Sequence, residues 1–457
     1  MTAIDAGQTP VLVGMRPPPA KASGALSSNG RDNPFDRIPM AAYQQPVWVQ
    51  KGLLGRAWLV NDPAGVKQVL IDKVGNYPKM DMENRFFRAL FGDGLLSRDG
   101  EAWRAHRRIM APSFDPRSVA GYAGAMADAA AEFADGWARL DNDAEVDVSE
   151  AMTLLTLEII CRTMFSSDYE EMTTLTGSAL SRSEDAFNFN LLDILPVIGG
   201  LRLKQREKKF AAIFAPMDGA VRRLIESRRA DPGRTDLLGR LVAALDEETG
   251  AKLTPQEVRD EVLTIFVAGH ETTASAMTFC WYLLSHYPEW EARLHAELDE
   301  VLGGRTPTEA DLPKLPLTRR IIEESMRLYP PAPGISSRVA KEADVICGEK
   351  VPKGGVIAIS AWVLHRHRAF WDAPETFDPD RFLPERSAGR PRFAYLPFGG
   401  GPRVCIGQMM AMTEATLILA TLAQRFRLRM RPGHQVAIQH RVTIRPRGGL
   451  PMRIERR

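Results

Sequence analysis

The pattern of apolar and polar positions predicts a mainly helical chain between residues 62 and 330. Its clearest element is a long helix that begins at the capping box Thr254-Pro255-Gln256-Glu257 and continues as an apolar run to about Leu284. At about 1.5 Å per residue, this helix would span roughly 45 Å. Because it is apolar on most sides, we expect it to be buried at the centre of the fold.

Weaker patterns surround the long helix. Amphipathic stretches predict further helices at Pro288–Leu302, Leu317–Leu328 and about Ile406–Phe426. Alternating or β-branched stretches predict short strands, at Val47–Val60, Ser337–Ala340, Asp344–Ile346, Gly355–Ser360 and Val442–Ile454, the last folding into a hairpin around Gly448–Gly449. Together they indicate an α+β fold, mainly α with small β-sheets. It would form one large domain at 31–457, after a flexible N-terminal arm at 1–30.

Composition excludes several kinds of protein. Lys and Arg number 59 against 57 Asp and Glu, so the net charge of +2 gives no argument for nucleic acid or an acidic membrane as a partner. No apolar window is long enough for a spanning helix, and the N-terminus lacks the pattern of a signal peptide. The four cysteines are scattered without a CxxC pair and predict neither a disulfide framework nor a zinc site. We therefore expect a soluble, cytoplasmic protein.

The most distinctive segment is the glycine-rich loop Phe398–Gly407, which contains Cys405. Its glycines at 399–401 allow backbone conformations that are closed to other residues. Cys405 lies at the predicted start of a helix and close to Arg403, and both features favour a thiolate. A nucleophilic cysteine lacks a matching His nearby in sequence, so a thiolate facing a planar iron porphyrin fits better. The alternative is a glycine turn with an incidental cysteine.

A second unusual segment, Ala268–Thr273, lies in the middle of the long helix. A mid-helix glycine such as Gly269 costs about 1 kcal/mol relative to alanine, and a buried Glu271 is costly unless it is paired. Sequences tolerate such conflicts mostly at functional sites. The alternative is a helix crossing that needs the glycine, with Thr272 bonded back to the preceding turn. The nearby His106 and His270 have no ligand spacing and are interpreted as ordinary polar residues.

On these motifs the chain resembles the cytochrome P450 family, in particular soluble bacterial members and the haem domain of flavin-fused fatty-acid hydroxylases. The loop matches the family pattern Phe-x-x-Gly-x-Arg-x-Cys-x-Gly at all its fixed positions. The resemblance implies that Cys405 ligates the iron of haem b. It also implies a set of haem-binding residues, which includes candidates for the two propionates: Trp103, Arg107, Ala268, Arg338, Phe398, Arg403 and Gly407. For Arg338 a charge at a strand edge is the alternative.

The resemblance assigns further roles around the haem. Thr272 would donate a hydrogen bond to bound oxygen, while Glu271 would relay protons from solvent. Glu324 and Arg327, which alone would indicate a surface pair, would join Arg381 to lock the irregular, proline- and aromatic-rich stretch at 370–397 that supports the cysteine loop. The expected substrate wall is apolar: Leu96, Ala268, Ala332 and Ile335, with Phe86, Phe87, Phe187, Phe189 and Ile444 as a second set that fits the core equally well.

The sequence thus predicts a haem-thiolate monooxygenase that inserts one atom of O2 into an apolar substrate such as a fatty acid, hydrocarbon or terpenoid. We expect no flavin or nicotinamide domain in this protein, so electrons from NAD(P)H would arrive through a ferredoxin or flavodoxin and its reductase. Arg104 and Arg108 are candidate contacts for that partner, with solvated helix charges as the alternative. A peroxide-dependent haem enzyme and a haem-binding sensor or carrier without turnover remain alternatives, although neither would need the acid–alcohol pair.

Overall fold

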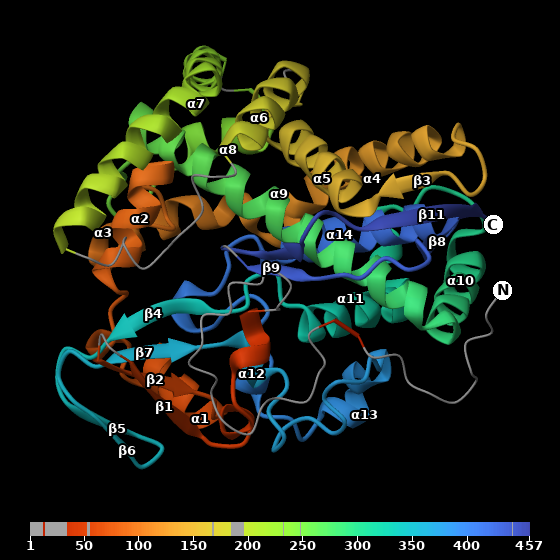
Figure 1. Cartoon of the computed structure of the whole chain (residues 1–457). Coiled ribbons are helices and arrows are strands. Elements are labelled where there is room, and N and C mark those ends of the chain that lie inside the picture. Colours follow the sequence, from red (N-terminus) through yellow and green to blue (C-terminus); the bar gives the residue numbers. More distant parts are fainter. Residues whose placement is uncertain are drawn as a thin grey trace.

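The computed structural model describes residues 12–13, 34–52, 55–166, 169–183, 196–231, 233–246, 248–440 and 442–457. Helices dominate and the sheets are small, so the expected fold class is confirmed (Figure 1). The longer helices are α2 Asp81–Phe91, α3 Gly100–Met110, α4 Pro116–Ala138, α5 Val148–Phe165, α6 Tyr169–Ser183, α7 Pro196–Ala230, α9 Pro255–His286, α10 Pro288–Leu302, α11 Pro316–Leu328 and α14 Gln408–Ala423. The shorter ones are α1 Pro63–Lys67, α8 Leu237–Ala243, α12 Ala361–Leu364 and α13 Pro384–Ser387.

Helix α9 is the long central helix that the sequence predicts. Its capping box is formed, since Glu257 N donates to Thr254 Oγ1 at 3.2 Å and Thr254 N donates to the Glu257 carboxylate at 2.9 Å. The helix crosses the middle of the molecule and packs against α5, α11, α7 and α14 (Figure 1). Most of its residues are buried, as expected of a helix that is apolar on most sides.

Four small sheets complete the described part of the fold. The largest has the order β1-β2-β7-β4, with only β2 and β7 parallel, and its strands are β1 Val47–Gly52, β2 Gly55–Val60, β7 Val356–Ile359 and β4 Ile335–Val339. The others are the pair β5 Asp344–Ile346 with β6 Glu349–Val351, the pair β9 Ile438–His440 with β10 Ile444–Pro446, and the triplet β3 Glu145–Asp147, β11 Pro451–Arg456 and β8 Phe426–Met430. The strands expected within Val47–Val60 are confirmed as the antiparallel pair of β1 and β2.

The expected C-terminal hairpin around Gly448–Gly449 is wrong. Strand β10 pairs with β9, which precedes it, whereas β11 pairs with β8 and β3. The two glycines do make a turn, with positive φ at both, but it carries the chain from one sheet to another. Local alternation identified the strands, but strand pairing depends on segments far away in sequence.

Two residues of the segment expected to be a flexible arm are described, and they contact the domain. Leu12 is fully buried among core side chains. The backbone of Val13 lies between two tyrosines, since Val13 N donates to Tyr282 Oη at 3.1 Å and Tyr329 Oη donates to Val13 O at 2.8 Å. Tyr329 in turn stacks on Phe279 of α9 at 4.4 Å, so this point of the segment is tied to the central helix.

Candidate active site

The cysteine loop is shaped by a close approach of two backbones. Gly401 has φ +70°, and a Cβ there would collide with the carbonyl oxygen of Leu70, so only glycine fits. The loop closes where Cys405 N donates to Phe398 O at 2.9 Å. Helix α14 starts at Gln408, directly after the loop, so the sulfur lies near the positive end of a helix dipole, as the sequence predicts.

Cys405 retains exposed surface although protein surrounds it closely. Burial raises the pKa of its thiol, and the amide of Gly407 and the charge of Arg107 act in the opposite direction. Because Cys405 is surrounded by protein and still has exposed surface, we infer that it borders an internal space. Two other cysteines differ from it, since Cys161 and Cys280 are fully buried in the core.

Four cations, Lys79, Arg107, Arg338 and Arg403, form a cluster around Arg403, two residues before this cysteine. Arg403 forms an ion pair with Asp99, and its guanidinium lies 4.2 Å from the ring of Trp103. Its charge also lowers the pKa of Lys79 and of Arg338. Burial, then repulsion from Arg403 and Arg338, lowers the pKa of Lys79 to about 8. Burial and Arg403 likewise lower the pKa of Arg338 to about 10. The fourth cation, on the same helix as Trp103 and 6.0 Å from its ring, is Arg107.

The protein itself satisfies this charge only in part. Both Lys79 and Arg338 are buried and donate to backbone carbonyls, of Leu96 and Ser336 respectively. Among the described carboxylates, Asp99 forms an ion pair with the cluster through Arg403. Burial alone would raise the pKa of Asp99, but Arg403 and the amide of Gly100 lower it overall. A buried excess of positive charge fits a ligand with carboxylates, such as the two propionates of haem.

The middle of α9 presents a small patch of surface between two buried stretches of the helix. Ala268 is exposed and Thr272, one turn later, is half-buried. A Cβ at Gly269 would lie 3.6 Å from Ile160, an ordinary contact, so the packing of α9 on α5 does not require a glycine there. The helix-crossing alternative therefore loses its main support. His270 is buried and bonded to Phe266 O at 2.6 Å, and burial lowers its pKa, as suits an ordinary core histidine.

The acid and the alcohol of α9 have separate partners. Thr272 Oγ1 donates to Ala268 O at 2.7 Å, which is the back-bonding considered from the sequence. Glu271 Oε1 accepts a hydrogen bond from Thr443 Oγ1 at 2.6 Å. Thr443 belongs to the turn between β9 and β10, a segment that the sequence did not connect with α9.

The predicted structural cluster is fully buried. Arg327 forms two hydrogen bonds with Glu324, at 2.6 and 2.7 Å, and Arg381 reaches the same carboxylate at 3.3 Å. Arg327 also donates to the carbonyls of His365 and Pro374, at 2.9 and 2.8 Å. These bonds tie α11 to the irregular stretch that leads into the cysteine loop, so the interpretation of Glu324 and Arg327 as a surface pair is excluded.

The expected substrate wall is only partly accessible. Leu96, Ala332 and Ile335 are half-buried, and so are Phe86 and Phe87. The two remaining aromatic candidates lie outside the described residues: Phe187 and Phe189. By contrast Ile444 is fully buried, and this lack of surface argues against it as a wall residue.

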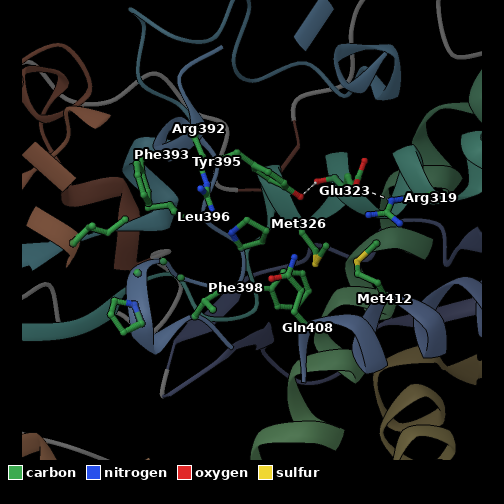
Figure 2. A pocket seen from close by; sticks show the side chains of 17 residues that line it. Arg319, Glu323, Met326, Arg392, Phe393, Tyr395, Leu396, Phe398, Gln408 and Met412 are labelled. Carbon is green, nitrogen blue, oxygen red and sulfur yellow. Dashed lines mark hydrogen bonds and ion pairs between the residues drawn. The ribbon is translucent and has the colours of Figure 1, made fainter. Parts of the chain in front are cut away.

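A cavity of about 390 Å³ borders the cysteine loop, but it is not lined by Cys405 or by α9. Figure 2 shows Phe398 and Leu396 on its wall. On another side Tyr395 donates to the carbonyl of Glu323 at 2.7 Å, and Glu323 pairs with Arg319 (Figure 2). This cavity therefore lies beside the loop, apart from the surface of Ala268 and Thr272.

Several contacts in this region could not be predicted from the sequence, including those of His106, which was interpreted as an ordinary polar residue. His106 of α3 bridges two carboxylates of α9, Glu261 at 2.8 Å and Glu257 at 3.1 Å, and so clamps α3 to the central helix. Asp99 carries an N-cap signal before α3, but its pairing with Arg403 could not be seen from that signal. For Lys79 no local signal exists. Among the described residues no group of three or more His, Cys, Asp or Glu could hold a metal ion.

A cysteine with interior surface, buried cations beside it and an acid–alcohol pair on a central helix define a haem-thiolate site, and the residues present fit that group. The chain belongs to the cytochrome P450 family: the family model described as Cytochrome P450 matches residues 26–450. It is accordingly a haem-containing P450 monooxygenase, an oxidoreductase that draws electrons from a redox partner.

Known proteins support the assignment over most of the chain. The Cyclooctat-9-en-7-ol 5-monooxygenase of Streptomyces melanosporofaciens is 37% identical over 390 residues, covering 83% of this chain and 81% of that protein. A Bacillus cereus bifunctional cytochrome P450/NADPH–P450 reductase is 35% identical over 380 residues, covering 80% of this chain and 35% of that protein. The crystal structure of the cytochrome P450DA heme domain superposes with a TM-score of 0.79 at 29% identity, covering 90% of each chain. Among the described residues, no helix has the length and hydrophobicity to cross a bilayer.

Proposed function

We propose that Cys405 ligates the haem iron and that Trp103, Arg107, Arg338 and Arg403 hold the propionates. Lys79 joins them. Phe398 and Gly407 would flank the sulfur, and Ala268 would leave room above the porphyrin. A thiolate-bound haem supplies the activation of O2 for insertion of one oxygen atom into a C–H bond. The observation that carries the assignment is that Cys405 keeps exposed surface directly before the start of α14, with Arg403 stacked on Trp103 two residues away.

The catalytic contribution of the chain would come from Thr272 and Glu271 of α9. Thr272 is half-buried one turn after the exposed Ala268, so its hydroxyl can exchange the bond to the Ala268 carbonyl for one to a ligand in that space. Glu271 is the residue directly before Thr272, and its carboxyl group can exchange protons with solvent. This pair distinguishes an O2-using enzyme from one that uses only peroxide and from a sensor without turnover.

The reduced protein with carbon monoxide tests the iron–sulfur bond. We expect absorption at about 450 nm, lost in Cys405→Ser but kept in Cys347→Ser, whose cysteine also has exposed surface. Turnover with a surrogate ferredoxin, its reductase and NAD(P)H should then yield hydroxylated product. Product formed only with added peroxide would indicate a peroxide-dependent enzyme, and none under any supply would indicate a sensor or carrier.

For the substrate we propose a cyclic, terpenoid-type hydrocarbon or alcohol ahead of a fatty acid. The support is the relative that acts on cyclooctat-9-en-7-ol and the apolar character of Leu96, Ala268, Ala332 and Ile335. Titration with cyclic terpenoid alcohols and with fatty acids of similar size, followed by the Soret shift on water displacement, separates the two. Tighter binding of the fatty acids would contradict this choice.

As electron source we propose a separate ferredoxin or flavodoxin with its reductase. Arg104 is the better contact candidate of the two arginines, since its side chain is 56% exposed and its ion-pair partner Glu101 is exposed as well, whereas Arg108 is paired with the buried Asp246 at 2.8 Å. Arg104→Gln should raise the KM for ferredoxin at low salt and leave substrate binding unchanged. We also propose a cytoplasmic location, because all four cysteines are free and a working thiolate suits a reducing compartment.

A further inference from the structure

The turn between β9 and β10 is fixed to the central helix at two consecutive residues. Thr443 Oγ1 donates to Glu271 Oε1 at 2.6 Å, and Ser275 Oγ donates to Ile444 O at 2.6 Å. On its other side Ile444 N donates to Pro331 O at 3.0 Å. Thr443 is 4% exposed and Ile444 is fully buried, so little water competes for these bonds. The hydroxyl of Thr443 is therefore held at a defined place beside α9.

The geometry of α9 separates the acid from the alcohol. Glu271 and Ser275 are four residues apart and share one face of the helix, which is the face that binds the turn. Thr272 is bonded to Ala268 O, also four residues away, and Ala268 is the exposed residue of this region. The helix thus presents its alcohol towards the open space and its acid towards the C-terminal turn.

We infer that Thr443 is the residue that positions Glu271 for proton delivery, an inference that rests on the proposed function of Glu271. A bond of 2.6 Å from a hydroxyl to a carboxylate lies in the range of strong charge-assisted hydrogen bonds. Since Thr443 comes from a fixed turn and carries a single hydroxyl proton, its bond selects one orientation of the Glu271 carboxylate. Without this bond the Glu271 side chain would sample several rotamers, and it would spend less time in the one that delivers protons towards Thr272.

The test uses the holoenzyme with three variants. Thr443→Val keeps the shape and removes the hydroxyl, Thr443→Ser keeps the hydroxyl, and Glu271→Ala removes the acceptor. We expect kcat to fall roughly five- to tenfold in Thr443→Val, with KM and the Soret shift on substrate binding unchanged. Thr443→Ser should restore the wild-type kcat, together with the wild-type solvent deuterium isotope effect on kcat. In the Glu271→Ala background, Thr443→Val should have no further effect on kcat.

A second readout does not depend on turnover. The melting temperatures of wild type, the two single variants and the double variant form a cycle, and the Thr443–Glu271 coupling should appear as a shift on the order of 2 °C. An unchanged or higher kcat in Thr443→Val, or an equal fall in the Glu271→Ala background, would overturn the positioning role. If the wild type shows neither the band near 450 nm nor turnover, the proposed function fails instead, and the melting cycle still decides whether the contact exists.

Discussion

Replacing Glu324 with Gln removes the charge of the carboxylate that Arg327 and Arg381 share. In the wild type this carboxylate accepts two hydrogen bonds from Arg327, one from Arg381 and one from the amide of Asp378 at 2.9 Å. The glutamine would keep one acceptor oxygen, but its NH2 group is a hydrogen-bond donor. This group would face the N–H donors of Arg327, and no hydrogen bond can form between two donors. Two buried cations would then lack their counter-charge.

The expected cost follows from burial. The side chains of Glu324 and Arg327 have no exposed surface, and that of Arg381 is 6% exposed. Removing one partner of such a buried pair typically costs about 3–5 kcal/mol, a large share of the roughly 5–15 kcal/mol that stabilises a folded domain. With an unfolding entropy of roughly 2 cal/mol/K per residue, the melting temperature of a 457-residue chain should fall by about 3–5 °C.

Thermal unfolding followed by circular dichroism measures this loss, and absorption at about 450 nm of the reduced carbon monoxide complex reports whether the cysteine loop is intact. The matched control is Arg319→Gln on the same helix, because Arg319 pairs with Glu323 but is 60% exposed and should contribute less than about 1 kcal/mol. If Glu324→Gln melted within about 1 °C of the wild type, the claim that this cluster fastens the loop support would be refuted.

Two further outcomes are expected. Gly401→Ala should abolish haem incorporation, because a Cβ there collides with Leu70 O, whereas Gly433→Ala, also at positive φ but in open space, should cost only about 1 kcal/mol; haem absorbance per chain compares them. The pKa of Lys79 is about 8 in the folded chain, against 10.5 for a free lysine side chain, so the unfolded chain binds more protons between those values. Stability of the haem-free protein should therefore rise from about pH 8 to about pH 10.5, by up to about 3 kcal/mol, and Lys79→Met should flatten this rise in denaturant titrations.

The sequence predicted best where the signal is local. The capping box at Thr254 and the apolar run after it defined α9 to within a few residues. The glycine run before Cys405 predicted backbone conformations that are closed to other residues, and Gly399 and Gly401 adopt them at positive φ. The tail failed for the opposite reason. Alternation located β10 and β11, but their partners are β9 and the pair of β8 and β3, and no local pattern specifies such pairings.

The site shows the same division. Glu324 and Arg327 were recognisable by spacing, yet taken alone that spacing favoured a solvated pair, and only the fold places the pair in the core. Thr443 lies 172 positions from Glu271 and carries no motif of its own. Residues that act through one tertiary contact leave no periodic or compositional signal, so their discovery required the arrangement of α9 against the C-terminal turn.

The cluster of Lys79, Arg107, Arg338 and Arg403 departs from the rule that buried charges in a folded protein are paired. Lys79 and Arg338 are buried and repel each other, and burial with repulsion lowers the pKa of both. A chain selected only to fold would replace one of them with an apolar residue, since buried unpaired charge opposes folding. The arrangement makes sense if a dianionic ligand shares the site, because binding then converts repulsion into attraction and stabilises the fold by mass action. Haem retention and global stability should therefore be coupled through the same arginines and lysine.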